Sequence, residues 1–212
     1  MLMKIHEGHM GIVKCRRRAQ ESVWWPSITT DINRLVENCQ QCLQMRVQWA
    51  ESFQPTTMTS RPWALVGMDI FKAAGVHHLV VQDYFSHSFE LVRLENLKSE
   101  GVVLRAKNIF ARHGIPETMR SDNGTQFMAQ EFKRFAKDYG FDHITYSPKF
   151  PQSNGAAKKA LKVAKSILFK SMDPILGLLS YRSTPLESKF SPAELLFGHK
   201  LHTTFPHSRA SL

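Results

Sequence analysis

Two short pairs of metal-binding side chains lie near the start of the chain. His6 and His9 have two residues between them, as do Cys39 and Cys42, and 29 residues separate the two pairs. Neutral imidazoles and cysteine thiolates are the ligands that tetrahedral Zn²⁺ prefers, and two closely spaced pairs can complete one coordination shell. The spacing therefore predicts a structural zinc site. The alternatives are two core cysteines with two surface histidines, or redox chemistry at the Cys-x-x-Cys pair.

The segment between the pairs predicts a helix that ends at Cys39, because Ile32 and Val36 share a helical face with it. Cys42 is then expected in the following turn. A module of about 45 residues is too small to bury a sufficient core unaided, which favours metal-dependent folding. The third cysteine, Cys15, is expected to be a buried apolar residue, and it or a neighbouring histidine is the alternative ligand.

Two aspartates stand at the ends of predicted strands in the middle of the chain. Asp69 ends the strand expected at 64–71, and Asp122 follows the strand expected near 117–121. Carboxylates at the ends of neighbouring strands can hold one divalent cation, whereas two-metal phosphoryl chemistry generally needs a third acid. Taken singly, each aspartate is more ordinarily a turn former, and a capped strand end is the preferred interpretation of Asp83.

The elements that must position these carboxylates follow one another from Trp63 onward. Short apolar or alternating runs predict strands, and apolar residues at helical spacing predict helices. Besides the two strands above, strands are expected at 77–83, 88–94 and 142–146, and helices at 98–113 and 128–139. This order indicates an α/β fold with a mixed sheet.

A helix expected after the loop SPKFPQSNG has a basic edge. Lys158, Lys162 and Lys165 lie within about 60° of one another at 100° per residue. A solvated helix face is the ordinary interpretation of such lysines. The functional interpretation is that these lysines contact DNA, and the distribution of charge along the chain favours it.

The net charge of +10 is concentrated in the last third of the chain. Residues 1–60 carry +2 and residues 61–142 carry +1, whereas residues 143–212 hold 10 basic and 3 acidic side chains. This distribution predicts a polyanion-binding face. Nucleic acid is favoured over an anionic membrane, because no basic amphipathic helix with exposed aromatic residues and no membrane-spanning apolar run occurs. Three cysteines fit a reducing compartment rather than a disulfide framework.

In its ordered motifs the chain resembles the integrases of gypsy-type LTR retrotransposons and, more distantly, retroviral integrases. The motifs are HEGHMGIVKCRRRA, WWP, CQQC, VVQDYFS, IFARHGIP, SDNGTQF, SPKFPQSNG, LLSYRSTP and SPAELLFG. They extend over almost the whole chain in family order. The resemblance implies an α/β fold with a ribonuclease H-like core, in which helices flank a mixed five-stranded sheet. It also implies a small helical zinc-binding module before this core.

The resemblance divides the chain into four segments. The zinc-binding module is expected at 1–45, a linker at 46–62, the catalytic core at 63–200 and a tail at 201–212. The resemblance also implies truncation, because family members usually carry helical residues before the first histidine and a β-rich module after the SPAELLFG region.

The chemistry implied by the resemblance is 3′-processing and strand transfer of retroelement cDNA by a metal-bound Asp, Asp, Glu triad. Asp69 and Asp122 match the first two acids. The position of the Glu, with 35 residues between it and Asp122, holds Lys158, and no Asp or Glu occurs between Asp142 and Asp173. An ammonium group cannot bind a metal ion, so Mg²⁺ or Mn²⁺ is expected to bind weakly or not at all and catalysis to be impaired.

The resemblance also implies partners and a compartment. The DNA-contacting residues it indicates are Gln152, Asn154, Lys158, Lys159, Lys162 and Lys165. The implied partners are cDNA ends, target DNA and further copies of the chain, in the nucleus. Two functions fit: an impaired integrase of a retroelement, or a non-catalytic DNA- or protein-binding module retained by a host genome. An active enzyme with unusual metal use ranks third. Flanking reverse transcriptase sequence would favour the first, and an expressed independent reading frame the second.

Overall fold

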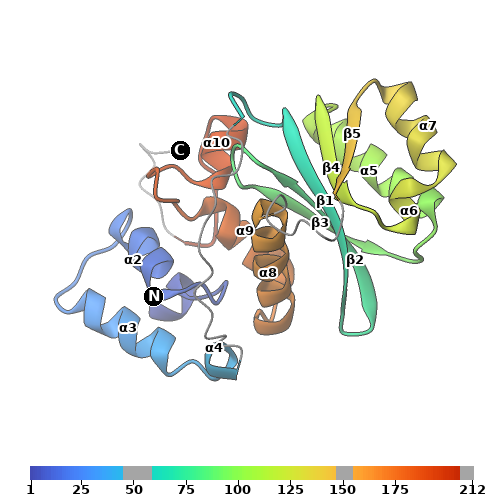
Figure 1. The fold of residues 1–212 in the computed structure, drawn as a ribbon. Coiled ribbons are helices and arrows are strands. Elements are labelled where there is room, and N and C mark those ends of the chain that lie inside the picture. Colours follow the sequence, from blue (N-terminus) through green and yellow to red (C-terminus); the bar gives the residue numbers. More distant parts are fainter. Residues whose placement is uncertain (45–58, 147–154, 206–212) are drawn as a thin grey trace. The chain divides into compact units, whose positions relative to one another are not determined.

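The computed structural model describes residues 1–44, 59–146 and 155–205, and the chain forms two compact units (Figure 1). The sheet unit is Phe53–Ala164. The helical unit joins Met1–Ser52 to Lys165–Leu212. Helix α8 (Gly155–Lys170) belongs to the sheet unit up to Ala164 and to the helical unit from Lys165 onward.

A mixed five-stranded sheet occupies the described part of the sheet unit, in the order β3-β2-β1-β4-β5. The strands are β1 (Leu65–Ala73), β2 (Val76–Asp83), β3 (Phe89–Leu94), β4 (Thr118–Asp122) and β5 (Asp142–Tyr146). Neighbours among the first three strands are antiparallel, whereas β4 runs parallel to both β1 and β5. The predicted fold class is confirmed, and every strand begins within one residue of its expected start.

The hairpin between β1 and β2 sets the register of the sheet. Its two loop residues, Ala74 and Gly75, have φ angles of +48° and +79°, and the flanking Ala73 and Val76 pair with each other. Positive φ at both central residues is the requirement of a type I′ turn, whose twist matches that of the strands. A fixed register decides the face on which each side chain of β1 lies, Asp69 included.

Helices α5 (Ser99–His113), α6 (Thr125–Met128) and α7 (Gln130–Tyr139) complete the described core of the sheet unit (Figure 1). The rings of Phe110 and Phe135 stack with their centroids 5.6 Å apart. Phe141 packs edge-on against both rings, at 5.6 and 5.1 Å. The predicted helices at 98–113 and 128–139 are confirmed, and their apolar faces are joined by this aromatic cluster.

The helical unit is built from short elements. They are α1 (Leu2–Ile5), α2 (Ile12–Gln20), α3 (Ile28–Glu37), α4 (Gln40–Gln44), α9 (Pro174–Ser183), α10 (Pro192–Phe197) and the end of α8. Helix α10 begins with a capping box, in which Ser191 and Glu194 each accept a hydrogen bond from the backbone amide of the other. Within the described residues, every helix is too short or too polar to cross a bilayer.

Residues from both ends of the chain share one apolar core in the helical unit. Its buried members are Ile5, Met10, Cys15, Ala19, Ile32 and Phe205. Phe205 is only 1% exposed, and the guanidinium of Arg18 lies 5.0 Å from the centroid of its ring. Close by, Lys4 Nζ donates a hydrogen bond to the Thr204 carbonyl oxygen at 3.2 Å. The last described residues therefore complete the core of the N-terminal module.

Truncating Phe205 to Ala is expected to destabilise the helical unit by roughly 3–5 kcal/mol, the usual cost of removing a buried phenyl ring. Phe197→Ala is the matched control, because Phe197 is 41% exposed in the same unit. We expect this control to cost below about 1 kcal/mol. Denaturant unfolding followed by tryptophan fluorescence measures both, and equal losses would contradict the role given to Phe205.

Candidate metal centres

Short elements of the helical unit bring the predicted zinc ligands together. His6 directly follows α1, and His9 lies in the loop before α2 with a left-handed backbone, φ 47°. Cys39 lies between α3 and α4, and Cys42 lies within α4. Cys42 was expected in a turn; the chain instead resumes as a short helix directly after Cys39.

The four side chains bring their potential ligand atoms close enough together to share one metal ion. His9 Nδ1 lies 3.3 Å from Cys39 Sγ and 3.8 Å from Cys42 Sγ, and His6 Nε2 lies 3.5 Å from Cys42 Sγ. One potential ligand atom from each residue falls within a group no wider than 4.8 Å. Tetrahedral Zn–N and Zn–S bonds of ordinary length place N and S about 3.6 Å apart. The donor set and its dimensions therefore fit a structural zinc ion.

The electrostatic surroundings favour neutral imidazoles. Burial lowers the pKa of His6 to about 4, and the nearby His9 acts in the same direction. Burial also lowers the pKa of His9, with Lys170 adding to the effect. Burial raises the pKa of Cys42 to about 11, so its thiol loses a proton when a cation binds. The histidines are already in their ligand form, and metal binding must displace the thiol proton.

Cys15 lies beside this ligand set. It is fully buried, as expected from the sequence, and burial raises the pKa of its thiol to about 12. Its Sγ atom lies 3.6 Å from Nδ1 of His6 and donates a hydrogen bond to the Met10 carbonyl oxygen at 3.3 Å. Cys15, the alternative ligand offered by the sequence, therefore lies against the Nδ1 side of His6, whereas the ligand group itself consists of His6, His9, Cys39 and Cys42.

The two candidate catalytic aspartates follow the paired stretch of two parallel strands at matching positions. Gly67 of β1 pairs with Arg120 of β4 in parallel register, and Asp69 and Asp122 each lie two residues further along. Residues two apart on a strand point to the same face, so the two carboxylates lie on the same face of the sheet as Gly67 and Arg120. Parallel pairing of β1 and β4 is therefore what brings them together.

Each carboxylate is held by a backbone amide. Asp69 Oδ1 accepts a hydrogen bond from the Ile70 amide at 2.7 Å, and Asp122 Oδ1 accepts one from the Gly124 amide at 3.0 Å. Asp122 is exposed and Asp69 is half-buried. Asp69 lies within β1 rather than at its end, because the strand continues to Ala73, two residues past the expected range. Neighbouring carboxylate oxygens are ligands that Mg²⁺ prefers, and a divalent cation here remains a prediction.

The remaining predicted residues fall on or before α8. Lys158 and Lys159 lie within this helix, in a stretch where only the backbone is described. Gln152 and Asn154 lie outside the described residues. Lys162 is exposed. Its neighbour on the predicted basic edge, Lys165, is half-buried, so the structure leaves the DNA-contacting role of these residues a prediction.

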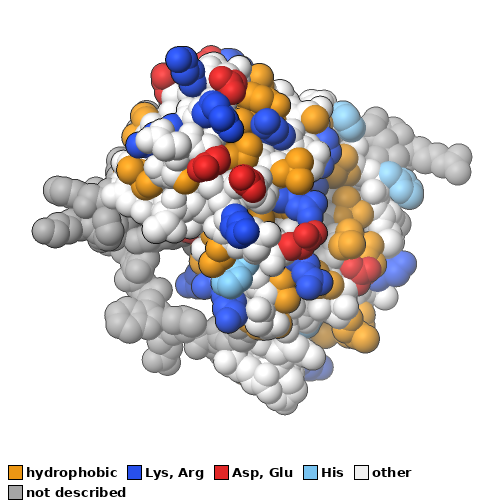
Figure 2. All heavy atoms as spheres, turned by 90° about the vertical axis from the view of Figure 1, so that its right-hand side faces the viewer, with side chains coloured by type: hydrophobic (Ala, Val, Ile, Leu, Met, Phe, Trp, Pro, Cys, Tyr) orange, Lys and Arg blue, Asp and Glu red, His pale blue; other side chains and the backbone are white. Residues whose placement is uncertain are grey.

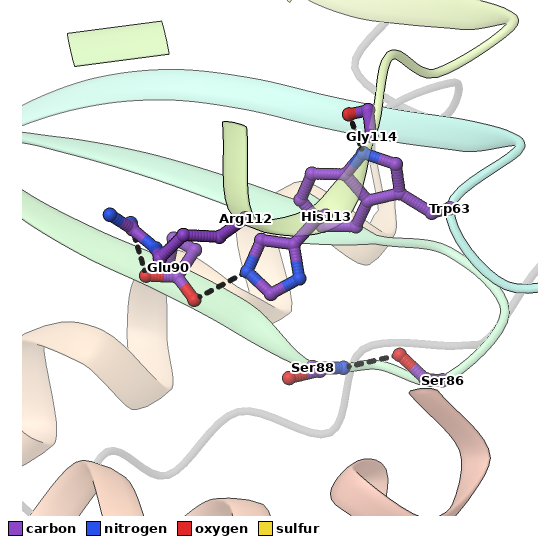
Figure 3. Close-up of polar contacts among 7 residues, drawn as sticks. All are labelled: Trp63, Ser86, Ser88, Glu90, Arg112, His113 and Gly114. Carbon is purple, nitrogen blue, oxygen red and sulfur yellow. Dashed lines mark hydrogen bonds and ion pairs between the residues drawn. The ribbon is translucent and has the colours of Figure 1, made fainter. Parts of the chain in front are cut away.

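Asp83 caps the end of β2, which is the structural role that the sequence favoured for it. Its fully buried carboxylate accepts hydrogen bonds from the Trp63, Phe85 and Ser86 amides and from the Ser86 hydroxyl, which is 2.6 Å away. The Ser86 Oγ atom in turn accepts a hydrogen bond from the Ser88 amide at 3.1 Å (Figure 3). Asp83 thus fixes the turn between β2 and β3 and the chain entering β1.

A polar cluster at the end of α5 also contacts Trp63, in the segment that leads into β1 (Figure 3). Trp63 Nε1 donates a hydrogen bond to the Gly114 carbonyl oxygen at 2.8 Å, and its ring lies 4.5 Å from that of His113. Glu90 of β3 binds His113 Nε2 at 2.9 Å and pairs with Arg112 at 3.1 Å. These contacts fasten α5 to the sheet and are structural.

Sequence reasoning also missed an arginine beside the aspartates. Arg120 lies on the same face of β4 as Asp122, and its guanidinium lies 5.7 Å from the ring centroid of Tyr84 and 5.6 Å from that of Tyr146. Cation–π contacts on two rings hold the guanidinium in place. No sequence signal indicated this, because the three residues come from separate elements.

Charges of both signs cover the face that carries α7, where lysine and arginine side chains alternate with aspartate and glutamate (Figure 2). The helix itself contains Glu131, Lys133, Arg134, Lys137 and Asp138. Its cations are therefore partly compensated by neighbouring carboxylates, unlike the lysines of α8, whose helix contains no acidic residue.

The fold and the ligand cluster together define an integrase core preceded by a zinc-binding module. The integrase zinc-binding domain family matches residues 1–48, and the integrase core domain family matches residues 59–151. The chain therefore contains an integrase zinc-binding domain and an integrase core domain. It is similar to the Gag-Pol polyprotein of walleye dermal sarcoma virus, with 25% identity over 87% of this chain and 12% of that protein, and to the Pro-Pol polyprotein of simian foamy virus type 3, with 24% identity over 98% of this chain and 20% of that protein.

Individual relatives support the same assignment. An uncharacterised protein of Caenorhabditis elegans is 31% identical over 216 residues, covering 96% of this chain and 17% of that protein. Gypsy retrotransposon integrase-like protein 1 of Homo sapiens is 23% identical, covering 69% of this chain and 30% of its own length. The chain thus spans less than a third of either relative.

A solved structure shows the same fold. The simian T-cell lymphotropic virus intasome contains a chain that aligns with a TM-score of 0.63 at 20% identity, covering 99% of this chain and 78% of that one. At this identity the likeness concerns the fold alone.

Proposed function

We propose that this chain is an integrase-derived DNA-binding protein whose 3′-processing and strand-transfer activity is impaired. The proposal is supported by Asp69 and Asp122, each of which lies two residues beyond the paired Gly67 and Arg120 of the parallel strands β1 and β4. It is also supported by Lys158 of α8, which the family resemblance puts at the position of the third acid. A pair of divalent cations supplies the clamp on the attacking and leaving oxygens in such chemistry. The two carboxylates provide ligands for one weakly held ion, and the ammonium group provides none.

The DNA-binding half of the proposal rests on charge. Residues 143–212 hold seven more basic than acidic side chains, and α8 presents lysines without acidic neighbours in its own sequence. Phosphate contacts of this kind bind all sequences alike and position the protein on the duplex. Retroelement cDNA ends and target DNA are the proposed ligands, with further copies of the chain and a nuclear location following from the family.

A double charge reversal on α8 tests DNA binding. We expect Lys162→Glu combined with Lys165→Glu to weaken binding to unrelated duplexes equally. The steepness with which log K falls with the logarithm of salt concentration should decrease by about 2, which is about one for each lost phosphate contact. The matched control is Lys133→Glu with Lys137→Glu on α7, where both lysines are exposed in a mixed-charge face. Fluorescence anisotropy over a range of salt concentrations measures both variants.

Binding that depends strongly on one sequence, a flat salt dependence, or equal losses from the two double variants would contradict this account. The alternative, a host-retained non-catalytic module, rests on the same Lys158 and predicts the same DNA contacts. Genomic context separates the two functions, because a retroelement remnant is flanked by reverse transcriptase sequence or long terminal repeats.

A further inference from the structure

The imidazole of His6 lies between two cysteine sulfurs. Its Nε2 atom is 3.5 Å from Sγ of Cys42, on the side of the other zinc ligands. Its Nδ1 atom is 3.6 Å from Sγ of Cys15. The thiol of Cys15 directs its own hydrogen to the Met10 carbonyl oxygen, 3.3 Å away. A continuous chain of contacts therefore runs from a backbone carbonyl through Cys15 to the zinc-ligand cluster.

We propose that Cys15 is a positioning residue for the zinc ligand His6. A neutral imidazole carries a single N–H, and only its unprotonated nitrogen can bind a metal ion. Because the thiol hydrogen of Cys15 is directed to Met10, its sulfur presents a lone pair to His6 and accepts the Nδ1–H, beside the Met10 backbone, which also hydrogen-bonds with His6. Nε2 is thereby left as the ligand atom. The ring nitrogen of a metal-bound histidine that does not bind the metal commonly donates a hydrogen bond, and the acceptor of this bond fixes the tautomer and the ring orientation.

The other histidine provides an internal contrast. His9 faces the cysteine sulfurs with Nδ1, at 3.3 Å from Cys39 and 3.8 Å from Cys42. The two rings lie 5.0 Å apart at an interplanar angle of 73°. The arrangement therefore assigns zinc binding to Nε2 of His6 and to Nδ1 of His9, and the Cys15 contact is specific to the first. Cys15 itself is enclosed in the core with Ile5 and Phe205, which keeps its sulfur in place.

Zinc affinity of three full-length variants tests the role of Cys15. Cys15→Val keeps a similar shape but removes the acceptor, and we expect zinc affinity to fall by about 10–100-fold. Cys15→Ser keeps a hydrogen-bond donor and an acceptor at this position, and its zinc affinity should stay within roughly threefold of that of the unaltered chain. Ile32→Val, in the same core, is the packing control and should leave the affinity unchanged. Competition with a chromophoric chelator measures all three.

Nitrogen-15 spectra of the histidine rings in the zinc-loaded protein give a readout that packing does not mimic. We expect His6 to carry its proton on Nδ1 and to be coordinated through Nε2, and His9 to be coordinated through Nδ1. Coordination of His6 through Nδ1 would overturn the proposal even if Cys15→Val failed to fold. Equal zinc affinity in the Val variant and the unaltered chain, or equal losses in the Val and Ser variants, would overturn it as well.

Discussion

Replacing Cys39 by Ser should abolish stoichiometric zinc binding and unfold the N-terminal part of the helical unit. The expected loss is large, because structural zinc contributes roughly 10–16 kcal/mol of apparent binding free energy in small zinc modules. The ligands come from elements of four to ten residues, which are too short to be stable helices alone. Chelation of zinc from the unaltered chain should lower the helical content in the same way.

Metal analysis of the purified protein and far-ultraviolet circular dichroism before and after chelation measure this expectation. Gln44→Ser is a suitable control, because Gln44 is an exposed non-ligand in the same helix as Cys42. A chain purified without stoichiometric zinc, or one whose helicity is unchanged by chelation, would show that the four side chains are not a structural zinc site.

Changing Lys158 to Glu should tighten Mn²⁺ binding by at least about tenfold. The change alters the local charge by two units. At an effective dielectric near 20 and about 4 Å, each pair of unit charges interacts by about 4 kcal/mol before desolvation and rearrangement are counted. The unaltered chain should show no 3′-processing or strand transfer above background with either Mg²⁺ or Mn²⁺, because the second ion lacks its carboxylate.

A neutral variant distinguishes the effect of removing the positive charge from the effect of adding a carboxylate ligand. Lys158→Gln removes the positive charge without adding a carboxylate, and should recover only part of the affinity that Lys158→Glu recovers. Calorimetric titration with Mn²⁺ measures binding independently of turnover, and an oligonucleotide strand-transfer assay measures activity. Robust strand transfer by the unaltered chain that is lost in Asp122→Asn would show that another group serves the second metal ion.

Local patterns predicted most of the sheet unit. The alternation of apolar residues that marks a strand, and the three- to four-residue spacing that marks a helix, are properties of a few consecutive residues, and β5 (Asp142–Tyr146) agrees with its predicted bounds. The short helices α4 and α6 were not predicted, because four or five residues carry too little periodicity. Strand β1 runs to Ala73, two residues past its expected end at 71.

Some features of the candidate sites could likewise be predicted from local sequence patterns, and others could not. Ligand type and spacing were sufficient to predict the His6, His9, Cys39 and Cys42 cluster, since two short pairs leave few other arrangements. The importance of Lys158 came only from the resemblance, because a lysine on a basic helix has no local signal of replacing an acid. The packing of Phe205 into the N-terminal core could not be read from the sequence, since contacts over such separations leave no periodic pattern.

The burial of Phe205 in the N-terminal core has a consequence for the timing of synthesis. Lys4 and Thr204, which are hydrogen-bonded beside this ring, are separated by 200 positions in the chain. At translation rates of about 5–20 residues per second, the last zinc ligand, Cys42, is synthesised about 8–33 s before Phe205, the ring that completes the core. During this interval the apolar face of the N-terminal module remains uncovered. The zinc-binding module therefore reaches its final packing only after the sheet unit that follows it in the chain has been synthesised.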